Sequence, residues 1–322
     1  MIEVLKPGLE TTVQDWPGRK RYYNVGFPPC GALDSVSFRL GNLLVGNSAD
    51  AAGLECQFIG PSLRFTSDVI FAVTGADMGA TLDGAPHALW RSHAARAGQV
   101  LALGPARLGA RAYVAIAGGI DVPPFLGSRA TYTLAHVGGF EGRALKAGDV
   151  LPVGAPGQAR PGRSVRPECQ PVIERGRWTI EVVVGPNDDW IDQAGQARFF
   201  ATDWKLSSRS NRVGYRLEGP AWSFTRKAYD KAPENGAEPS NTIDHGYAIG
   251  AINLGGQTPI ILMNDALTLG GFINPYTVIS AAFAKLAQAR PGDLLRFLAL
   301  EVEAAQTLRR AQDRLCTAES LS

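Results

Sequence analysis

Three arginines, three serines and an asparagine stand within ten residues in the second half of the chain, where residues 207–216 read SSRSNRVGYR. Guanidinium groups match carboxylates and phosphates with two parallel hydrogen bonds. Serine hydroxyls and backbone amides in a turn can complete an anion site. The segment therefore predicts an anion-binding site. The alternative, which these residues leave open, is the solvated end of a β-hairpin.

A second polar cluster, MNDALTLGGF at residues 263–272, follows the strand-like residues 259–262. An Asn-Asp pair at the end of a strand, followed by two glycines, places polar side chains where backbone can approach a ligand closely. The cluster is therefore a second candidate site. A tight turn capped by Asp265 is the alternative.

The opening of the chain contains a long candidate loop, residues 11–34, with three prolines and three glycines. Loops of this length inside a compact domain are usually functional or disordered. Four bulky aromatic side chains argue against disorder: Trp16, Tyr22, Tyr23 and Phe27. We expect an ordered loop that forms part of a site, with a structural loop over a core edge as the alternative.

Composition excludes several classes of protein. A formal net charge of +2 predicts no strong field for nucleic acid or membranes. The four cysteines form no C-x-x-C pair, and no metal site is expected. No apolar run approaches the roughly 18 residues of a spanning helix, and no signal peptide is visible. We expect a cytoplasmic protein with reduced thiols.

Common catalytic signatures are also missing. The sequence has no G-x-x-x-x-G-K-[ST] loop for ATP and no G-x-S-x-G nucleophile elbow. It has no Met-Lys-Met motif, so the chain itself is not expected to carry biotin. A self-sufficient kinase or hydrolase is therefore hard to support from spacing alone.

The elements that must position these residues are mainly strands. Short β-branched runs alternate with turn signals, as at residues 69–73, 111–116 and 180–184, which is typical of β-barrels or sandwiches. Helices are the minority. They are expected after the N-cap Asp34 and in three further segments: residues 191–200, 281–289 and 300–315.

The chain is expected to contain two related β-barrel units. A turn that leads into a strand recurs at residues 97–101, 147–151 and 291–295. A stretch rich in Pro, Gly and Arg separates the halves and is interpreted as a linker. The predicted boundaries are a first barrel subdomain, a linker, a second barrel subdomain and a helical tail: residues 1–153, 154–177, 178–299 and 300–322.

Several blocks, taken together and in order, resemble one family, the allophanate hydrolase subunit 2 or KipA family. They are residues 11–15 with 18–19, 30–34, 43–47, 54–55, 73–76, 117–123, 126–129, 210–212 and 270–271. The family includes the C subunit of 5-oxoprolinase and the carboxyltransferase region of urea carboxylase, a biotin-dependent carboxyltransferase. The resemblance implies a mainly β fold of two cyclophilin-like β-barrel subdomains with a few helices. It also implies a partner, the B subunit of such complexes, of the KipI or allophanate hydrolase subunit 1 type.

The family members differ in the blocks that they match. Residues 30–34, 206–208 with 211–217, and 262–266 look more like the 5-oxoprolinase C subunit. Residues 27–29, 75–80 and 239–241 look more like urea carboxylase. A chain that carries neither a biotin carboxylase nor a biotin carrier favours the oxoprolinase complex.

The resemblance implies an ATP-dependent enzyme that, with the B subunit and possibly an A subunit, opens the small amide 5-oxo-L-proline to L-glutamate. Arg212, Asn211 and Ser210 would hold an oxyanion or phosphate. Asp265 and Thr268 would position the substrate or a proton, so Arg212, Asp265 and Thr268 are the predicted catalytic residues. The pocket wall would be formed by Gln14, Asp15 and Asp34. The last two predicted binding residues are Gly270 and Gly271.

Two other functions stay open. One is a carboxyltransferase that moves CO2 from carboxybiotin to a urea-like nitrogen, with biotin supplied in trans. The other is a regulatory binding protein of the KipA type. The sequence does not determine which amide is the substrate, where ATP binds, the stoichiometry of the complex, or whether the chain is active alone.

Overall fold

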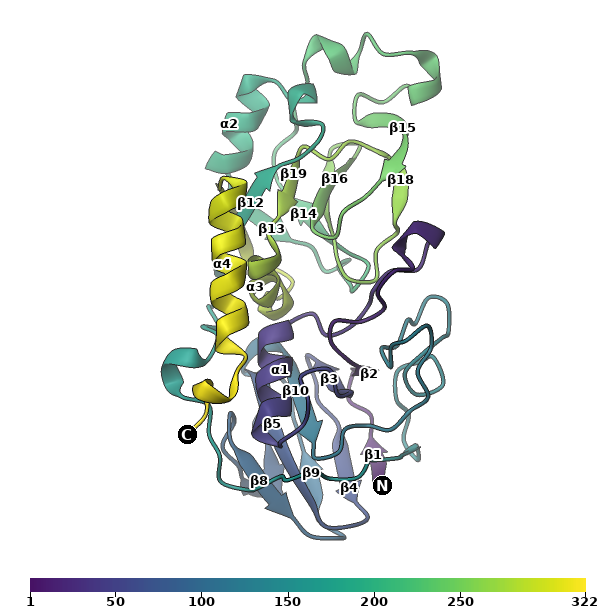
Figure 1. Cartoon of the computed structure of the whole chain (residues 1–322). Helices are drawn as coiled ribbons and strands as arrows, with labels where there is room; N and C mark the ends of the chain where they lie inside the picture. The colour runs from purple at the N-terminus through teal and green to yellow at the C-terminus, as the bar shows by residue number, and fades with distance from the viewer. The chain divides into compact units, whose positions relative to one another are not determined.

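The computed structural model describes all 322 residues and divides into two compact units (Figure 1). Unit 1 contains Met1–Lys20, Pro29–Ile173 and Ala311–Ser322, and unit 2 contains Arg21–Pro28 and Glu174–Arg310. Eight residues of the opening loop therefore belong to unit 2, although the residues on both sides of them belong to unit 1.

Unit 1 is built from two antiparallel sheets, with strand orders β11-β1-β4-β9-β6-β7 and β2-β3-β10-β5-β8. The first sheet contains β1 (Ile2–Lys6), β4 (Ser62–Phe65), β6 (Thr81–Leu82), β7 (Ala85–Pro86), β9 (Val100–Ala102) and β11 (Val150–Leu151). The second contains β2 (Glu10–Gln14), β3 (Gly53–Gln57), β5 (Val69–Asp77), β8 (Ser92–Ala95) and β10 (Leu108–Ile116). The first four residues of the predicted opening loop thus belong to strand β2.

The two sheets of unit 1 share one hydrophobic core. Val4 and Leu63 from the first sheet and Leu54, Val73 and Val114 from the second all belong to the same buried cluster. Alternate residues along each strand point to one face, so the sheets enclose this core between them.

Helix α1 (Ser35–Leu44) lies against β5 and β10 and confirms the helix predicted after Asp34. The Asp34 side chain caps it by accepting hydrogen bonds from Ser37 N at 3.0 Å and from Ser37 Oγ at 2.5 Å. Gly41 faces the Thr74 side chain, so the helix approaches the sheet closely at that point.

Unit 2 is a closed barrel of seven strands in the order β12-β19-β16-β17-β14-β13-β20. They are β12 (Arg177–Val184), β13 (Trp204–Leu206), β14 (Gly214–Glu218), β16 (Ala251–Gly255), β17 (Thr258–Leu262), β19 (Tyr276–Val278) and β20 (Leu294–Ala299). A separate two-stranded sheet joins β15 (Asn241–Gly246) to β18 (Leu269–Phe272). The mainly β fold predicted from the sequence is confirmed.

Three further α-helices fall where the sequence predicts them: α2 (Gln193–Ala201), α3 (Phe283–Gln288) and α4 (Val302–Leu315). Phe199 of α2 stacks on Tyr276 and on Phe297, with ring centroids 4.6 Å apart in both pairs, so this helix contributes to the barrel core. The 3-10 turns are Tyr23–Val25, Pro167–Cys169, Asp188–Trp190, Arg226–Ala228, Pro233–Asn235, Ser280–Ala282 and Ala318–Ser320.

The turn that recurs in the sequence has the same hydrogen bonds in all three copies. Its glycine has a positive φ each time, 90° at Gly98, 89° at Gly148 and 94° at Gly292, a conformation that favours glycine. In each copy a backbone N–H donates to the side chain three residues later: Arg96 to Gln99, Lys146 to Asp149 and Arg290 to Asp293. A strand follows in every case, namely β9, β11 and β20.

The segment predicted as a linker is partly held by unit 1. Ser164 and Ser322 exchange backbone hydrogen bonds, and Val165 N donates to Trp90 O. The division between the units falls between Ile173 and Glu174, inside the predicted linker. The domain boundaries drawn from the sequence remain predictions.

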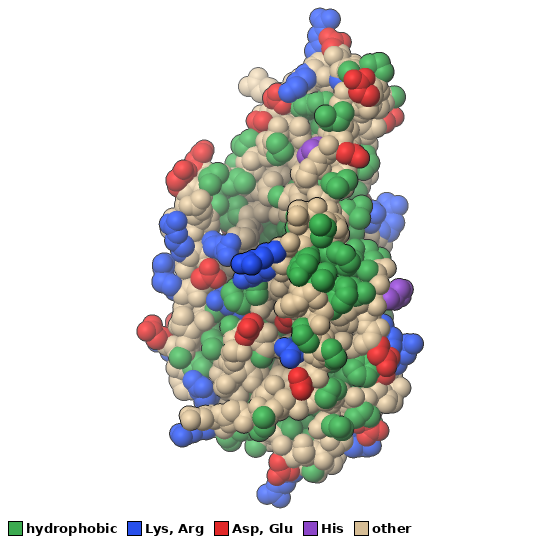
Figure 2. All heavy atoms as spheres, turned by 45° about the vertical axis from the view of Figure 1, so that its right-hand side comes forward, with side chains coloured by type: hydrophobic (Ala, Val, Ile, Leu, Met, Phe, Trp, Pro, Cys, Tyr) green, Lys and Arg blue, Asp and Glu red, His purple; other side chains and the backbone are tan.

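Charged side chains of both signs are interspersed on the surface that Figure 2 draws. This distribution accords with the small net charge of the chain. None of the helices is both long and apolar enough to cross a membrane.

Candidate functional site

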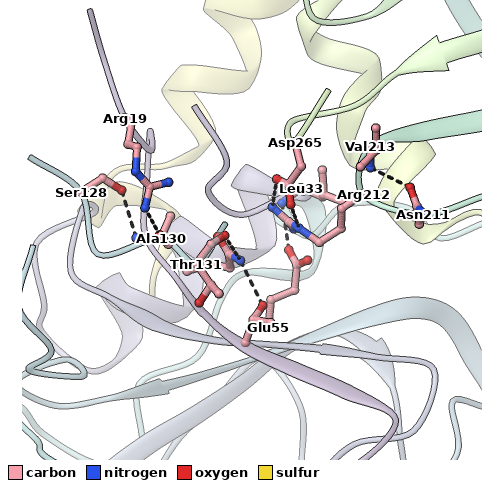
Figure 3. Close-up of polar contacts among 12 residues, drawn as sticks. Arg19, Leu33, Glu55, Ser128, Ala130, Thr131, Asn211, Arg212, Val213 and Asp265 are labelled. Atoms are coloured by element: carbon pink, nitrogen blue, oxygen red, sulfur yellow. Dashed lines mark hydrogen bonds and ion pairs between the residues drawn. The ribbon is translucent and has the colours of Figure 1, made fainter. Parts of the chain in front are cut away.

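The two polar clusters of the second half meet at a buried ion pair in unit 2 (Figure 3). Arg212 donates from Nε to Asp265 Oδ2 at 3.0 Å and from Nη2 to Asp265 Oδ1 at 2.8 Å. Only 5% of Arg212 and 2% of Asp265 are exposed. The backbone strengthens the junction, because Asp265 N donates to Arg212 O at 3.0 Å. Such two-pronged geometry is the strongest form of ion pair that a guanidinium makes.

The other polar residues of the first cluster close a hairpin between β13 and β14. Asn211 Oδ1 accepts from Val213 N at 2.9 Å (Figure 3), and Ser210 Oγ accepts from Arg216 N at 3.0 Å. Asn211 is exposed. Their side chains therefore organise the turn, as the hairpin alternative expects, and their role in anion binding remains a prediction.

The glycine pair of the second cluster lies in β18. The space that a side chain would fill at Gly270 is occupied by the Tyr247 ring, and at Gly271 it is occupied by Thr242 O. Both glycines thus permit close approach by the chain itself. Thr268 is buried, and its carbonyl accepts from Tyr247 N at 2.9 Å. The predicted ligand contacts of these residues remain predictions.

In unit 1 the opening loop meets the loop that contains residues 125–142. Asp15 is buried and accepts hydrogen bonds from Ser128 Oγ at 2.8 Å and from Arg129 N at 2.6 Å. Burial raises the pKa of the Asp15 carboxyl, although these two hydrogen bonds and the nearby Arg19 charge act in the opposite direction. Gln14 is fully buried and donates from Nε2 to Thr12 Oγ1 at 3.0 Å.

Arg19 lies beside these residues with only 3% of its surface exposed. Its Nη2 donates to Ala130 O (Figure 3). Its guanidinium lies 5.5 Å from the centre of the Phe125 ring. Its Nε and Nη1 atoms are buried and have no hydrogen-bond partner. Gln14 Oε1 is also buried and unpartnered. We call Gln14, Asp15, Arg19, Ser128 and Thr131 the loop site.

Asp34 is the third predicted site residue in unit 1, and it belongs to a buried polar network. Its backbone N donates to the Tyr113 hydroxyl at 2.8 Å, and that hydroxyl donates to Glu55 Oε2 at 2.9 Å. Arg111 Nε lies 3.5 Å from Glu55 Oε1. Burial, and next the Glu55 charge, raise the pKa of Tyr113 well above its ordinary value. The network ties helix α1 and the opening loop to the sheet.

Sequence reasoning missed Arg19, Arg111 and Tyr113. A signal for the last two was present, because Glu55 and Gln57 alternate in β3 as Arg111 and Tyr113 do in β10. The register pairs Arg111 with Gln57 and Tyr113 with Glu55, which places all four side chains on one face. Arg19 had no comparable signal, since its burial depends on a loop more than a hundred residues away.

Curated relatives match nearly the whole chain. The chain is 39% identical to urea amidolyase of Lachancea kluyveri over 323 residues, which cover 97% of the chain and 18% of that protein. It is 37% identical to the C subunit of 5-oxoprolinase from Escherichia coli over 321 residues, which cover 98% of the chain and 96% of that protein. The chain thus spans under a fifth of this urea amidolyase but nearly all of this oxoprolinase subunit.

Solved structures of related proteins also match nearly the whole chain. The urea amidolyase of K. lactis matches 98% of the chain with a TM-score of 0.93 and 37% identity, over 20% of that protein. The urea carboxylase of Kluyveromyces lactis matches 98% of the chain with a TM-score of 0.92 and 38% identity, over 29% of that protein.

A family model, described as carboxyltransferase domain, subdomain A and B, matches residues 25–299. The resemblance drawn from the sequence is confirmed by this match and by the names of the relatives. The chain belongs to the family of the carboxyltransferase domain, subdomains A and B.

Proposed function

We propose that this chain is the C subunit of a heteromeric, ATP-dependent 5-oxoprolinase of the cytoplasm, which acts with a B subunit of the KipI type and possibly an A subunit. The observation that carries the proposal is the match along 96% of the Escherichia coli 5-oxoprolinase C subunit at 37% identity. The complex opens 5-oxo-L-proline to L-glutamate and hydrolyses ATP to ADP and phosphate.

The stability of a lactam determines which catalytic groups the complex must provide. A lactam is a stable amide, and phosphorylation of its oxygen makes the ring carbon open to attack by water. The developing negative charge needs fixed hydrogen-bond donors in a site from which water is excluded. The chain carries no phosphate-binding loop motif, and we propose that the assembled complex supplies the ATP site.

The Arg212–Asp265 pair is the proposed catalytic unit of the barrel. Its two hydrogen bonds, and its burial, fix the guanidinium in one orientation, which is the preorganisation that charge stabilisation requires. Thr268 and the turn residues Ser210 and Asn211 complete the proposed catalytic and anion-binding set.

The remaining predicted residues are proposed to bind substrate within their own units. In unit 2, Gly270 and Gly271 of β18 are proposed to let the backbone approach the substrate closely. In unit 1, Gln14, Asp15 and Asp34 are proposed to form a pocket wall.

A second candidate is the carboxyltransferase of a urea carboxylase. The identity of 39% to urea amidolyase and the TM-score of 0.93 favour it. The same donors would then hold the carboxylate of carboxybiotin, and a separate biotin carrier would supply biotin. A regulatory binding protein without turnover is a third outcome that the assay below separates.

The experiment combines the purified chain with its partner subunits and supplies either 5-oxo-L-proline with ATP or urea with carboxybiotin. We expect glutamate and phosphate to form in a 1:1 ratio only when the complete set of subunits is present. Formation of carboxylated urea instead would establish the second candidate. Binding of the partners without either turnover would contradict both enzymatic proposals and favour a regulatory role.

A further inference from the structure

The segment of unit 2 that carries Thr268 and the glycine pair of the proposed site buries little apolar surface of its own. Its large apolar side chains are exposed, with 64%, 56% and 40% of their surface accessible: Leu267, Leu269 and Phe272. The two glycines between them have no side chain to bury. Segments with few buried apolar contacts open most easily. The position of residues 267–272 therefore depends on what the rest of unit 2 packs against them.

One buried side chain, Tyr247, packs against this segment on both sides of Thr268. Only 4% of Tyr247 is exposed. Before Thr268, the ring belongs to the same buried cluster as Ala266, which follows Asp265 in the chain. After Thr268, a Cβ atom at Gly270 would lie 2.8 Å from the Tyr247 hydroxyl oxygen. The ring therefore limits where the chain can lie before and after Thr268.

Both polar groups of the Phe272 backbone are bound by side chains. Phe272 N donates to the Tyr247 hydroxyl at 2.7 Å, and His245 Nε2 donates to Phe272 O at 3.0 Å. The pairing of β15 with β18, which lie side by side in Figure 1, is irregular between Asn241 and His245. Side chains thus supply hydrogen bonds where the ladder is interrupted, and the Tyr247 hydroxyl holds the end of β18.

The main chain of Tyr247 is bonded to two further segments of unit 2. Its N donates to Thr268 O at 2.9 Å. Its O accepts from the Tyr23 hydroxyl at 2.7 Å, and Tyr23 lies in the part of the opening loop that belongs to unit 2. A substitution of the Tyr247 side chain removes neither of these backbone atoms. Variants at Tyr247 therefore test the ring and the hydroxyl separately from the main chain.

We infer that Tyr247 is a positioning residue for substrate binding in unit 2. Its ring and hydroxyl hold residues 268–272 in the place where Thr268 and the backbone of the glycine pair meet the substrate. The inference rests on the proposed function for the role of these residues. Tyr247 is not assigned a contact with the substrate, because its own contacts are to the protein segment that it holds.

The first test measures amide hydrogen exchange in the full-length chain by NMR. Tyr247→Phe keeps the ring but removes the acceptor of the Phe272 N–H, so the Phe272 amide should exchange about tenfold faster than in the wild-type chain. Amides of the barrel strand β17 should exchange at the wild-type rate. Tyr229→Phe, at an exposed tyrosine of unit 2, is the matched control and should change neither. An unchanged rate at Phe272 in Tyr247→Phe would overturn the inference.

The second test measures steady-state kinetics of the complex assembled with each variant. Tyr247→Phe should raise the KM for 5-oxo-L-proline about threefold, and Tyr247→Leu, which also removes the ring beside Gly270, about tenfold or more. The KM for ATP should stay unchanged. The kcat should change less than the KM for 5-oxo-L-proline, because the Arg212–Asp265 pair keeps its own hydrogen bonds. A loss of folded chain alone would lower kcat and leave both KM values unchanged, and that result would contradict a positioning role.

The failure of this inference and the failure of the proposed function give different results. If the complex turns over 5-oxo-L-proline and both variants at Tyr247 leave its KM unchanged, the proposed function stands and the inference is wrong. If the complex carboxylates urea instead and Tyr247→Phe raises the KM for urea, the inference stands and the proposed function is wrong.

Discussion

Arg19 in unit 1 and Arg212 in unit 2 are both almost completely buried, with 3% and 5% of their surface exposed. Their surroundings differ. Arg212 is matched by the two oxygens of Asp265 at 3.0 and 2.8 Å, whereas Arg19 has a single backbone acceptor and two nitrogen atoms without partners. Burial of an arginine is therefore not by itself a functional signal.

The two arginines therefore differ in how their charge is balanced. The Asp265 carboxylate balances the charge of Arg212 and fixes its orientation, as the proposed catalytic role of the pair requires. The carboxylate of Asp15, which lies near Arg19, is engaged by Ser128 and Arg129, so it does not form a two-pronged ion pair with Arg19. Five predictions test these assignments.

Breaking the Arg212–Asp265 pair is expected to have the largest effect. Asp265→Ala should lower the free energy of unfolding by about 3–5 kcal/mol, because it leaves a buried charge without compensation. The double variant Arg212→Met/Asp265→Leu should lose much less, since neither charge remains. Urea denaturation of both variants measures this difference. If the double variant is as unstable as the single one, the pair does not have the matched character assigned to it.

Crowding the loop site should have the next largest effect. Gly138→Ala introduces a Cβ atom that overlaps Arg19 and Ala130 at a positive φ of 69°. Gly127→Ala, at a φ of 76°, has open space around the new atom and is the matched control. The control should cost about 1 kcal/mol for backbone strain, and Gly138→Ala about 1–3 kcal/mol more for overpacking. Equal losses in thermal unfolding would mean that residues 138–139 do not lie tightly on Arg19.

Removing the Arg19 guanidinium should change the stability of the free protein little. Arg19→Met loses the hydrogen bond to Ala130 but also removes a buried charge that lacks a full set of partners, so the free energy of unfolding should change by no more than about 1 kcal/mol. The same replacement at Arg212 should cost several times more. Equal losses from the two replacements, measured in urea, would remove the contrast between the two arginines.

The smallest effect is a pH dependence at Asp15. Because burial raises its pKa, the folded chain keeps the proton to a higher pH than the unfolded chain, whose carboxyl titrates near 3.8. The stability that Asp15 contributes is therefore present below about pH 4 and is lost as pH rises through its raised pKa. Wild-type protein should become less stable relative to Asp15→Asn over this interval, as measured by denaturation at a series of pH values.

Asp203 provides a comparison of opposite sign in unit 2. Hydrogen bonds from Arg296 and Arg177 hold the pKa of Asp203 well below its usual range. Its contribution should be present above about pH 4 and should decrease as the pH falls below that value. If Asp203→Asn and Asp15→Asn show the same sign of pH dependence, the assignment of the Asp15 environment is wrong.

Local signals explain the parts of the fold that the sequence predicts well. The helix after Asp34 follows from a capping side chain and from apolar residues at helical spacing. Both signals lie within a few residues of each other in the sequence. The recurring turns follow from a glycine and a polar side chain at fixed positions. The closure of the barrel, by contrast, depends on the parallel pairing of β12 with β20, in which Trp178 lies opposite Leu295. No local pattern encodes that register.

The candidate site likewise depends on contacts between distant segments that no local sequence pattern encodes. The sequence indicates Arg212 and Asp265 as reactive residues, but it does not show that they bind one another across 53 positions. Ser210 and Asn211 organise the hairpin turn in the structure, and their role in anion binding stays a prediction. Arg19 was missed because what distinguishes it, burial without a matching acceptor, arises only when residues 125–142 fold over it.

A high-resolution crystal structure of the chain tests the contrast between the two arginines most directly. We expect both Asp265 oxygens to accept hydrogen bonds from Arg212, and Arg19 Nε and Nη1 to have no acceptor within the protein. A side-chain carboxylate bound to Arg19 by two hydrogen bonds would contradict the account.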